Sequence, residues 1–291
     1  MIAEVQLWGR TIGAVSLEEG GTVARFQYDP DFAGSGIEIA PLTMPLRDEV
    51  YEFPLLAALQ FLTVVPVRGS FSDADRARSL LAFPVVGLMI GVALTALLSV
   101  VSATPQLGAV LAVVAMALIS GGLHLDGLAD SADAWAARRS DPADTLRIMR
   151  DPNCGPIGAT AIALVLIAKF AALSALLAAD NWAVLLVAPM LGRTAALALF
   201  ASTPYVRSGG LGSAYSEHLD RFSLWAATAI VAFIAMLVAG LTAILAVALL
   251  LVGLRTLMLR RIGGATGDTM GASIELTETC LLLSAAVLHS H

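Results

Sequence analysis

The chain has 291 residues, of which 58% are hydrophobic and only 14% charged, and its mean hydropathy is +0.82. A soluble domain carries about 25% charged residues, so this composition excludes an ordinary soluble protein and predicts that most of the chain faces lipid. The net charge of −6 arises within residues 1–54, which hold three arginines and nine acids, whereas the rest of the chain is neutral. Two cysteines, Cys154 and Cys280, are too few for a disulfide framework.

Residues 1–54 have the pattern of short β-strands. Apolar and polar residues alternate over residues 3–28 around a Glu19-Gly20-Gly21 turn, as they do in antiparallel strands. The segment resembles the N-terminal part of HipA-type toxin kinases through Leu7-Trp8-Gly9, Gly13, Phe26-Gln27-Tyr28-Asp29 and Leu42-Thr43-Met44-Pro45. No kinase core follows, so we expect an acidic appendage without a catalytic role.

From residue 55 onward, long apolar runs alternate with short polar segments. An α-helix needs about 20 apolar residues to cross a bilayer. Seven predicted spans result, at 80–103, 107–123, 157–179, 182–200, 223–239, 241–254 and 271–289. A short amphipathic helix over 55–65 precedes them at the membrane surface. The predicted fold is an all-α polytopic membrane protein with about seven transmembrane helices and a small β-rich N-terminal appendage, divided into residues 1–54 and 55–291. An alternative joins 223–254 into one long helix.

Arginines mark alternate connections between these spans. The segments 66–79, 124–156, 201–222 and 255–270 carry arginines, whereas the intervening connections have no Lys or Arg. Under the positive-inside rule, arginine-bearing connections lie in the cytoplasm. We therefore expect all four basic segments on the cytoplasmic side of the inner membrane and the C-terminus outside.

A run of acids stands where the second predicted span meets the cytoplasm. Asp126, Asp130 and Asp133 are spaced i, i+4 and i+7, so they share one face of a helix. Crowded acids repel one another, and a cation among them relieves this, with oxygen ligands favouring Mg²⁺. The alternative is a solvated acidic helix end. His124, just before the run, is a candidate general base or hydrogen-bond donor to a phosphate group, although a lone histidine is more often structural.

A second acidic set stands at the start of the last predicted span. Asp268, Glu275 and Glu278 are spaced to line one face of that helix. Ionisable groups in a span are costly, so a functional interpretation is the default. The turn before them, with Gly263, Gly264 and Gly267, offers backbone N–H groups to an anion. It is not a Walker A loop, because no Gly-Lys-Ser/Thr follows.

Four basic residues are candidates for binding phosphate groups. Arg147 and Arg150 are three residues apart on one helical face and could clamp a pyrophosphate, or else serve as ordinary positive-inside anchors. Lys169 and Arg193 fall inside apolar spans. They should face the bundle interior, where they would neutralise substrate phosphates or pair with the acids.

Together these motifs resemble the cobalamin synthase family, the adenosylcobinamide-GDP ribazoletransferases. The resemblance covers residues 55 to about 289 and rests on separated motifs in the same order. They are Leu59 to Pro66, Phe83-Pro84-Val85-Val86-Gly87, His124 to Asp133, Arg147 to Asp151 with Gly155, and Gly263 to Glu278. One departure is Ala134-Trp135-Ala136-Ala137-Arg138, where the family tends to carry glycines.

The resemblance implies a Mg²⁺-dependent phosphotransferase. The ribose 3′-hydroxyl of α-ribazole, or of its 5′-phosphate, would attack the phosphorus on the cobinamide arm of adenosylcobinamide-GDP, and GMP would leave. The lipid bilayer is an expected partner and nucleic acid is not, while a homo-oligomer and association with other nucleotide-loop assembly enzymes stay open. The implied roles are Mg²⁺ binding for Asp126, Asp130 and Asp133, a second metal or base set in Asp268, Glu275 and Glu278, and phosphate binding for Arg147, Arg150 and Lys169.

Three other readings of the sequence fit less well. A CDP-alcohol phosphotransferase calls for Asp-Gly-x-x-Ala-Arg, but Asp126-Gly127 is followed by Leu128-Ala129-Asp130 and the arginine is missing. A transporter or cation channel would place its acids at mid-depth, whereas here they cluster at one membrane side. A toxin–antitoxin binding module acting through residues 1–54 is disfavoured because the kinase core is missing.

Overall fold

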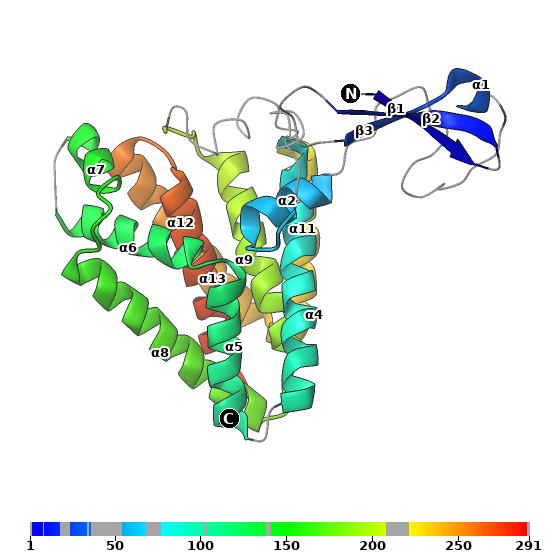
Figure 1. The fold of residues 1–291 in the computed structure, drawn as a ribbon. Coiled ribbons are helices and arrows are strands. Elements are labelled where there is room, and N and C mark those ends of the chain that lie inside the picture. The colour runs from blue at the N-terminus through cyan, green and yellow to red at the C-terminus, as the bar shows by residue number, and fades with distance from the viewer. Residues whose placement is uncertain are drawn as a thin grey trace.

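The computed structural model describes residues 2–7, 9–17, 24–33, 35, 54–67, 77–101, 104–137, 141–207 and 221–289. These residues form a bundle of long helices with a small sheet to one side (Figure 1). The predicted combination of a helical membrane protein and a β-rich N-terminal segment is confirmed.

The N-terminal sheet has three antiparallel strands in the order β1 (Ile2–Leu7), β2 (Arg10–Leu17) and β3 (Ala24–Tyr28). A one-turn helix, α1 (Pro30–Ala33), follows. Ile12, Tyr28 and Phe32 form the small core of this N-terminal segment, where the Tyr28 and Phe32 rings stack with centroids 5.8 Å apart. The Leu42 to Pro45 motif and the Glu19 to Gly21 turn lie outside the described residues.

Prolines and capping side chains explain where several helices of the bundle begin. Proline stands at the start of α5, α7 and α8, where its missing N–H costs nothing. Thr104 caps α5 through the N–H of Leu107, and Asp141 caps α7 through the N–H of Ala143. The helical elements are α2 (Pro54–Leu62), the 3₁₀ helix η1 (Leu80–Ala82), α4 (Phe83–Val101), α5 (Pro105–Ile119), α6 (Leu123–Ala136), α7 (Pro142–Ile148), α8 (Pro156–Ala178), α9 (Ala183–Ser202), α11 (Arg221–Ala239), α12 (Leu241–Ile262) and α13 (Gly267–His289).

Six of the described helices are long and apolar enough to cross a membrane, and a seventh span results if α5 and α6 are counted together. That pair is bent by 85°. The predicted span 107–123 is therefore interrupted: α5 ends at Ile119, and Gly121 and Gly122, with φ of 62° and 75°, turn the chain into α6. Only glycine adopts such angles without strain. As a result, α6 runs across the end of the bundle instead of along it (Figure 1).

One helix boundary agrees with the expectation and one differs from it. Gly240, with φ of 88°, separates α11 from α12, so residues 223–254 form the two predicted helices and not the single long helix of the alternative. The predicted loop 255–270 is mostly helical, because α12 continues to Ile262 and α13 already begins at Gly267. The apolar pattern stops where a helix leaves lipid, but its hydrogen bonds continue until a residue such as Gly263 ends them.

The centre of the bundle is α9, which is buried along most of its length. It packs against α4, α11 and α13. Gly87 of α4 allows this closeness, since a Cβ there would lie 2.4 Å from the carbonyl oxygen of Pro189 in α9. Outward-facing side chains of α8, α11 and α12 are apolar, as expected of a surface in lipid; examples are Ile167, Leu237 and Leu249.

Candidate functional site

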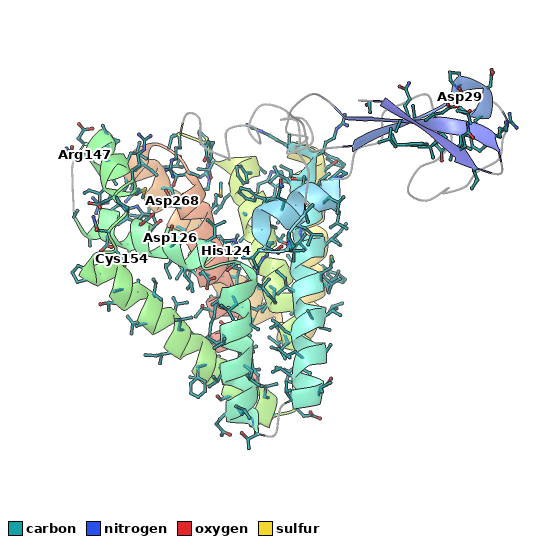
Figure 2. All side chains as sticks on the ribbon, viewed as in Figure 1. Asp29, His124, Asp126, Arg147, Cys154 and Asp268 are labelled. Carbon is teal, nitrogen blue, oxygen red and sulfur yellow. The ribbon has the colours of Figure 1, made fainter. Side chains whose placement is uncertain are left out.

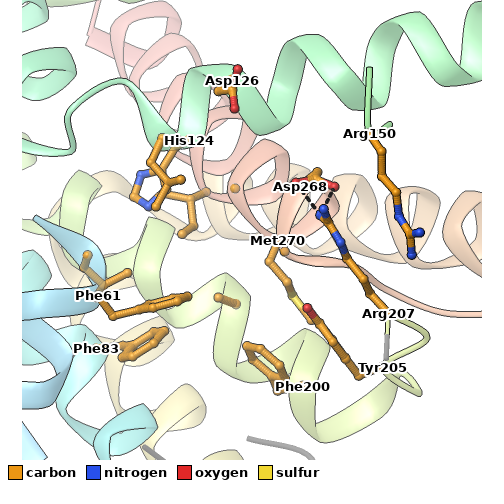
Figure 3. A pocket seen from close by; sticks show the side chains of 16 residues that line it. Phe61, Phe83, His124, Asp126, Arg150, Phe200, Tyr205, Arg207, Asp268 and Met270 are labelled. Carbon is orange, nitrogen blue, oxygen red and sulfur yellow. Dashed lines mark hydrogen bonds and ion pairs between the residues drawn. The ribbon is translucent and has the colours of Figure 1, made fainter. Parts of the chain in front are cut away.

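A cavity of about 510 Å³ lies where α2, α4, α6, α9 and α13 meet (Figure 3). Figure 2 shows His124, Asp126 and Asp268 at the end of the bundle opposite the C-terminus marked in Figure 1. Sequence motifs far apart in the chain thus converge. The polar and charged residues that line the cavity are His124, Asp126, Arg150, Tyr205, Arg207 and Asp268.

Two glycines bring the two acidic motifs together. A Cβ on Gly127 of α6 would lie 2.6 Å from the backbone oxygen of Asp268, and one on Gly271 of α13 would lie 3.2 Å from the Cα of His124. Because neither residue has a side chain, α6 lies directly on the first turns of α13. This contact sets Asp126 and Asp268 in one cavity although 142 residues separate them in the chain.

The carboxylates of this site influence one another. Asp126 is exposed, and Asp130, one turn later on α6, is half-buried. Burial, followed by the charges of Asp126, Asp268 and Asp133, raises the pKa of Asp130 to about 6. In the described part of the chain, no three Asp, Glu, His or Cys side chains are close enough to hold one metal ion. The Mg²⁺ site therefore stays a prediction.

Asp133 has a different set of partners from the other acids of α6. Its carboxylate accepts hydrogen bonds from the backbone N–H groups of Gly155, at 2.7 Å, and Gly158, at 2.9 Å. These N–H groups belong to the first turn of α8, whose own cap residue, Gly155, has no side chain to offer. Asp133 therefore caps α8 from a neighbouring helix, and it does not line the cavity.

The two arginines expected on one helical face are separated. Helix α7 ends at Ile148, because Pro152 follows and disfavours helical geometry at the residue before it. Arg147 is largely exposed and pairs with Asp144 at 3.0 Å, whereas Arg150 lies in the following turn and lines the cavity. The expectation of a shared face is therefore wrong.

The turn that carries Arg150 is shaped by Asp151. Its Oδ1 accepts the backbone N–H of Asn153 at 3.0 Å and the Asn153 side-chain amide at 2.7 Å. These two hydrogen bonds lower the pKa of the Asp151 carboxyl. The turn leads into Gly155 and α8, so the Asp133 cap and the Asp151 turn hold opposite ends of the same short connection.

Arg207 is a cavity residue that the sequence analysis did not single out. Its Nη1 donates to both carboxylate oxygens of Asp268, at 3.2 and 2.9 Å. A short parallel bridge holds it there: Val206 N–H bonds to the oxygen of Ala265 at 3.0 Å, and Ala265 N–H bonds to the oxygen of Pro204 at 2.8 Å. The only signal in the sequence was its place in an arginine-bearing segment after a span.

The glycine-rich turn before α13 has mainly structural duties. Gly263 ends α12 in the left-handed conformation, and a Cβ on Gly264 would lie 2.3 Å from the oxygen of Pro204, which would break the bridge. Gly267 alone of the three lines the cavity. The helix start is capped reciprocally, since the N–H of Thr266 bonds to Oγ1 of Thr269 and the N–H of Thr269 bonds to Oγ1 of Thr266.

Glu275 and Glu278 belong to a separate buried group. Lys169 of α8 donates to both of them at 2.6 Å, and Arg193 of α9 donates to Glu278. All four side chains are between 2% and 6% exposed. Of the two predicted uses of Lys169 and Arg193, the structure shows pairing with the acids. Two positive and two negative charges compensate one another in the bundle interior.

His124 lies between the acids and the apolar part of the cavity (Figure 3). Its side chain is buried, and its Nδ1 has no hydrogen-bond partner in the described part of the protein. A buried polar atom without a partner is costly, which indicates that a ligand or water completes this position.

A family model described as cobalamin-5-phosphate synthase matches residues 54–286. The chain belongs to this family. Three curated relatives, each named adenosylcobinamide-GDP ribazoletransferase, cover 80% of this chain. The relative from Pseudomonas fluorescens strain Pf0-1 is 46% identical over 240 residues and 99% covered, that from Pseudomonas putida strain GB-1 is 48% identical over 237 residues and 98% covered, and that from Stutzerimonas stutzeri strain A1501 is 47% identical over 240 residues and 98% covered. No solved structure matches the chain.

The cobalamin-5-phosphate synthase match includes every residue that lines the cavity. A second family model, the HipA N-terminal domain, matches residues 3–66. Both expected resemblances are confirmed. The two matches overlap at residues 54–66, which include α2 and the cavity residues Phe61 and Leu62. The division into domains at residue 54 stays a prediction.

Proposed function

We propose that this chain transfers α-ribazole, or its 5′-phosphate, onto adenosylcobinamide-GDP and releases GMP. The relatives that carry this activity in their name match over nearly their whole length at 46% to 48% identity. One structural observation supports the proposal most directly: the Arg207–Asp268 pair shares a cavity with Asp126 and Arg150. Cleavage of a diphosphate needs cationic side chains for the phosphates and carboxylates for a metal ion, and both are present here.

The carboxylates of this cavity fit Mg²⁺ better than a metal that needs a full protein cage. Mg²⁺ is usually held by one or two carboxylates, with waters and substrate phosphates completing its shell. Asp126 and Asp268 line the cavity and would supply oxygen ligands, with Asp130 one turn after Asp126 on the same helix. Burial and, after it, the charges of its acidic neighbours raise the pKa of Asp130, and a divalent cation would relieve that repulsion. Asp133, Glu275 and Glu278 are held by other groups, so we leave them out of the metal site.

When bound, Mg²⁺ would offset the negative charge that builds up on the phosphate oxygens. Arg150 and Arg207 line the cavity and would bind the diphosphate. The ribose 3′-hydroxyl oxygen forms a bond to the phosphorus on the cobinamide arm, and the bond from that phosphorus to GMP breaks, with GMP keeping the electron pair. His124 accepts the hydroxyl proton at its unpartnered Nδ1.

We further propose that the cavity opens to the cytoplasm from the inner membrane. Arg150, Arg207 and Arg261 lie at the cavity end of the chain's spans, in segments that the positive-inside rule assigns to the cytoplasm. Cys154 is exposed in the same region and offers a label. A membrane-impermeant maleimide should label Cys154 in inverted inner-membrane vesicles and leave it unlabelled in intact cells; the reverse result would invert the topology.

The transfer itself is tested with the full chain in lipid, supplied with adenosylcobinamide-GDP, α-ribazole and Mg²⁺. We expect GMP and a cobalamin product in equal amounts. Asp126→Asn and Asp268→Asn should abolish both, whereas Asp144→Asn, an acid outside the cavity, should leave both within about twofold of the native rate. Absence of product with the native chain, or an Asp126→Asn variant with native activity, would contradict the proposal.

A further inference from the structure

The cavity has two chemically different sides. Figure 3 shows Phe61, Phe83 and Phe200 on one side, and Arg150, Arg207 and Asp268 on the other. Leu62, Ala196 and Ile274 also line the cavity and belong to the same apolar cluster as Phe83 and Phe200. The diphosphate chemistry proposed above uses only the charged side, so the aromatic side has no role in it.

Aromatic rings from three separate elements build this apolar side. Phe61 of α2 stacks against Phe83 of α4, with ring centroids 5.8 Å apart and planes inclined by 21°. Phe200 of α9 stacks on Tyr205 at 6.1 Å and 22°, and Tyr205 lies beside Arg207 (Figure 3). All four rings line the cavity, so they give it an aromatic wall that can pack against another aromatic group.

Figure 3 shows the polar side chain of His124 on the same side of the cavity as the Phe61 and Phe83 rings. Its Nδ1 is buried and unpartnered. A ligand that fits here therefore has an apolar aromatic part for the rings and a polar atom for His124, where the aromatic side meets the acids.

We propose that this aromatic side binds the 5,6-dimethylbenzimidazole base of α-ribazole, an inference that rests on the function proposed above. The benzo edge of that base, with two methyl groups, has no hydrogen-bonding atom and suits the walls of Phe61, Phe83 and Phe200. Guanine, the other base in the reaction, carries several donors and acceptors on its edge. On the apolar side these would lose their water without replacement, which is costly.

The size of the cavity agrees with the smaller of the two substrates. At about 510 Å³ it falls within the range of about 300 to 1,000 Å³ typical of sites for single small ligands. A corrin ring with its side arms and a GDP group is several times larger than α-ribazole. With the base on the rings, the ribose lies at His124, and its 3′-hydroxyl points to the side that holds Asp126 and Asp268.

The test measures binding of α-ribazole alone to the full chain in lipid nanodiscs. Phe61→Ala should weaken binding about 5- to 100-fold, the range found when an aromatic residue that stacks on a base is removed. Phe61→Tyr keeps the ring and should bind within about threefold of native. Phe233→Ala, which removes a ring exposed on the outer face of α11, is the matched control and should bind as native. Thermal unfolding of each variant separates loss of the ring from loss of the fold.

Two further probes distinguish the competing occupants. Benzimidazole riboside without the two methyl groups should bind about tenfold more weakly than α-ribazole to the native chain, since each buried methyl contributes about 0.8 kcal/mol. GDP binding should not change in Phe61→Ala. If the variant weakens GDP and leaves α-ribazole unchanged, the rings hold guanine; if neither changes, the rings hold no base, and both outcomes overturn the inference.

The outcome also separates this inference from the proposed function. Ring-dependent binding of α-ribazole without release of GMP from adenosylcobinamide-GDP would leave the base subsite standing and remove the transfer activity. Full transfer activity with a native KM for α-ribazole in Phe61→Ala would support the proposed function and overturn the base subsite.

Discussion

Arg207 and Asp268 face each other on the cavity wall, where one guanidinium nitrogen of Arg207 donates to both carboxylate oxygens of Asp268. The side chains are 31% and 18% exposed, so the pair can be reached by substrate and solvent. The backbone bridge between Tyr205 and Ala265 brings together the two chain segments that carry these residues. A diphosphate bound here would compete with Asp268 for Arg207, and a metal ion would compete with Arg207 for Asp268.

We predict that Arg207→Gln lowers kcat about 10²- to 10³-fold, because a positive charge aimed at the phosphates is lost. Arg207→Lys should recover only part of the rate, since a point charge replaces a planar group that binds two oxygens. Steady-state GMP release measures both variants. A native kcat in Arg207→Gln would show that the pair is structural.

The separation of Arg147 from Arg150 gives a second prediction. Arg150→Ala should raise the KM for adenosylcobinamide-GDP at least tenfold, because it lines the cavity, while Arg147→Ala should change it less than twofold. Both substitutions remove the same charge from the same side of the membrane. Equal effects would show that the arginines act only through membrane anchoring.

Gly127 sets the distance between α6 and α13, so Gly127→Ala should lower stability by about 1–3 kcal/mol and reduce activity. The new Cβ would meet the Asp268 backbone, which cannot move without displacing the α13 start. Gly253→Ala is the control, since a Cβ there meets nothing within 4 Å and should stabilise α12 slightly. Thermal unfolding in detergent measures both; equal melting temperatures would rule out a tight α6–α13 contact.

The buried charges of Lys169, Arg193, Glu275 and Glu278 should behave as one unit. Glu275→Gln leaves two cations against one carboxylate in the bundle interior, which should cost about 3–5 kcal/mol. Lys169→Met together with Glu275→Gln restores neutrality, because the Arg193–Glu278 pair remains. The double variant should therefore be less destabilised than the sum of the single ones. Additive losses in detergent unfolding would mean that the four charges act independently.

Asp130 gives a prediction about pH. Its pKa in the folded protein, about 6, lies above the ordinary value of 3.8, so the folded state holds this proton more tightly than the unfolded state. Without Mg²⁺, stability should therefore fall as pH rises from about 4 to about 6. Asp130→Asn should remove that part of the slope and should also lose the stabilisation that added Mg²⁺ gives the native chain. Unfolding curves at several pH values, with and without Mg²⁺, measure both; an unchanged slope in the variant would contradict the assignment.

The sequence predicted the features that depend on the spacing of residues along one helix and on the length of an apolar run. Apolar runs located the spans, and the i, i+4, i+7 spacing placed Asp126, Asp130 and Asp133 on one helix. It could not show which groups each acid meets, because partners come from other helices. Asp133 meets the start of α8, and Glu278 meets Arg193, and neither pairing leaves a periodic pattern. Arg207 was missed for the same reason, since a β-bridge holds it and not a helix.

The distribution of arginines along the sequence also did not reveal which groups each arginine contacts. The positive-inside rule treated Arg255 and Arg261 as membrane anchors. The structure shows Arg255 donating to the oxygen of Ser202 at the end of α9 and Arg261 to the oxygen of Trp135 near the end of α6. Both arginines thus satisfy carbonyl groups that a helix end leaves open. A count of charges locates a membrane side, but it does not reveal such hydrogen bonds.

The close packing of α6 on α13 also dictates when the site can exist during synthesis. Chains grow from the N-terminus, so α6 with its acids emerges long before the segment 267–274 that completes the cavity wall. A nascent chain halted before residue 267 would hold Asp126, Asp130, Arg150 and Arg207 and still have no site. The enzyme would therefore be inert throughout membrane insertion and gain its cavity in a single late step, when the last helix docks.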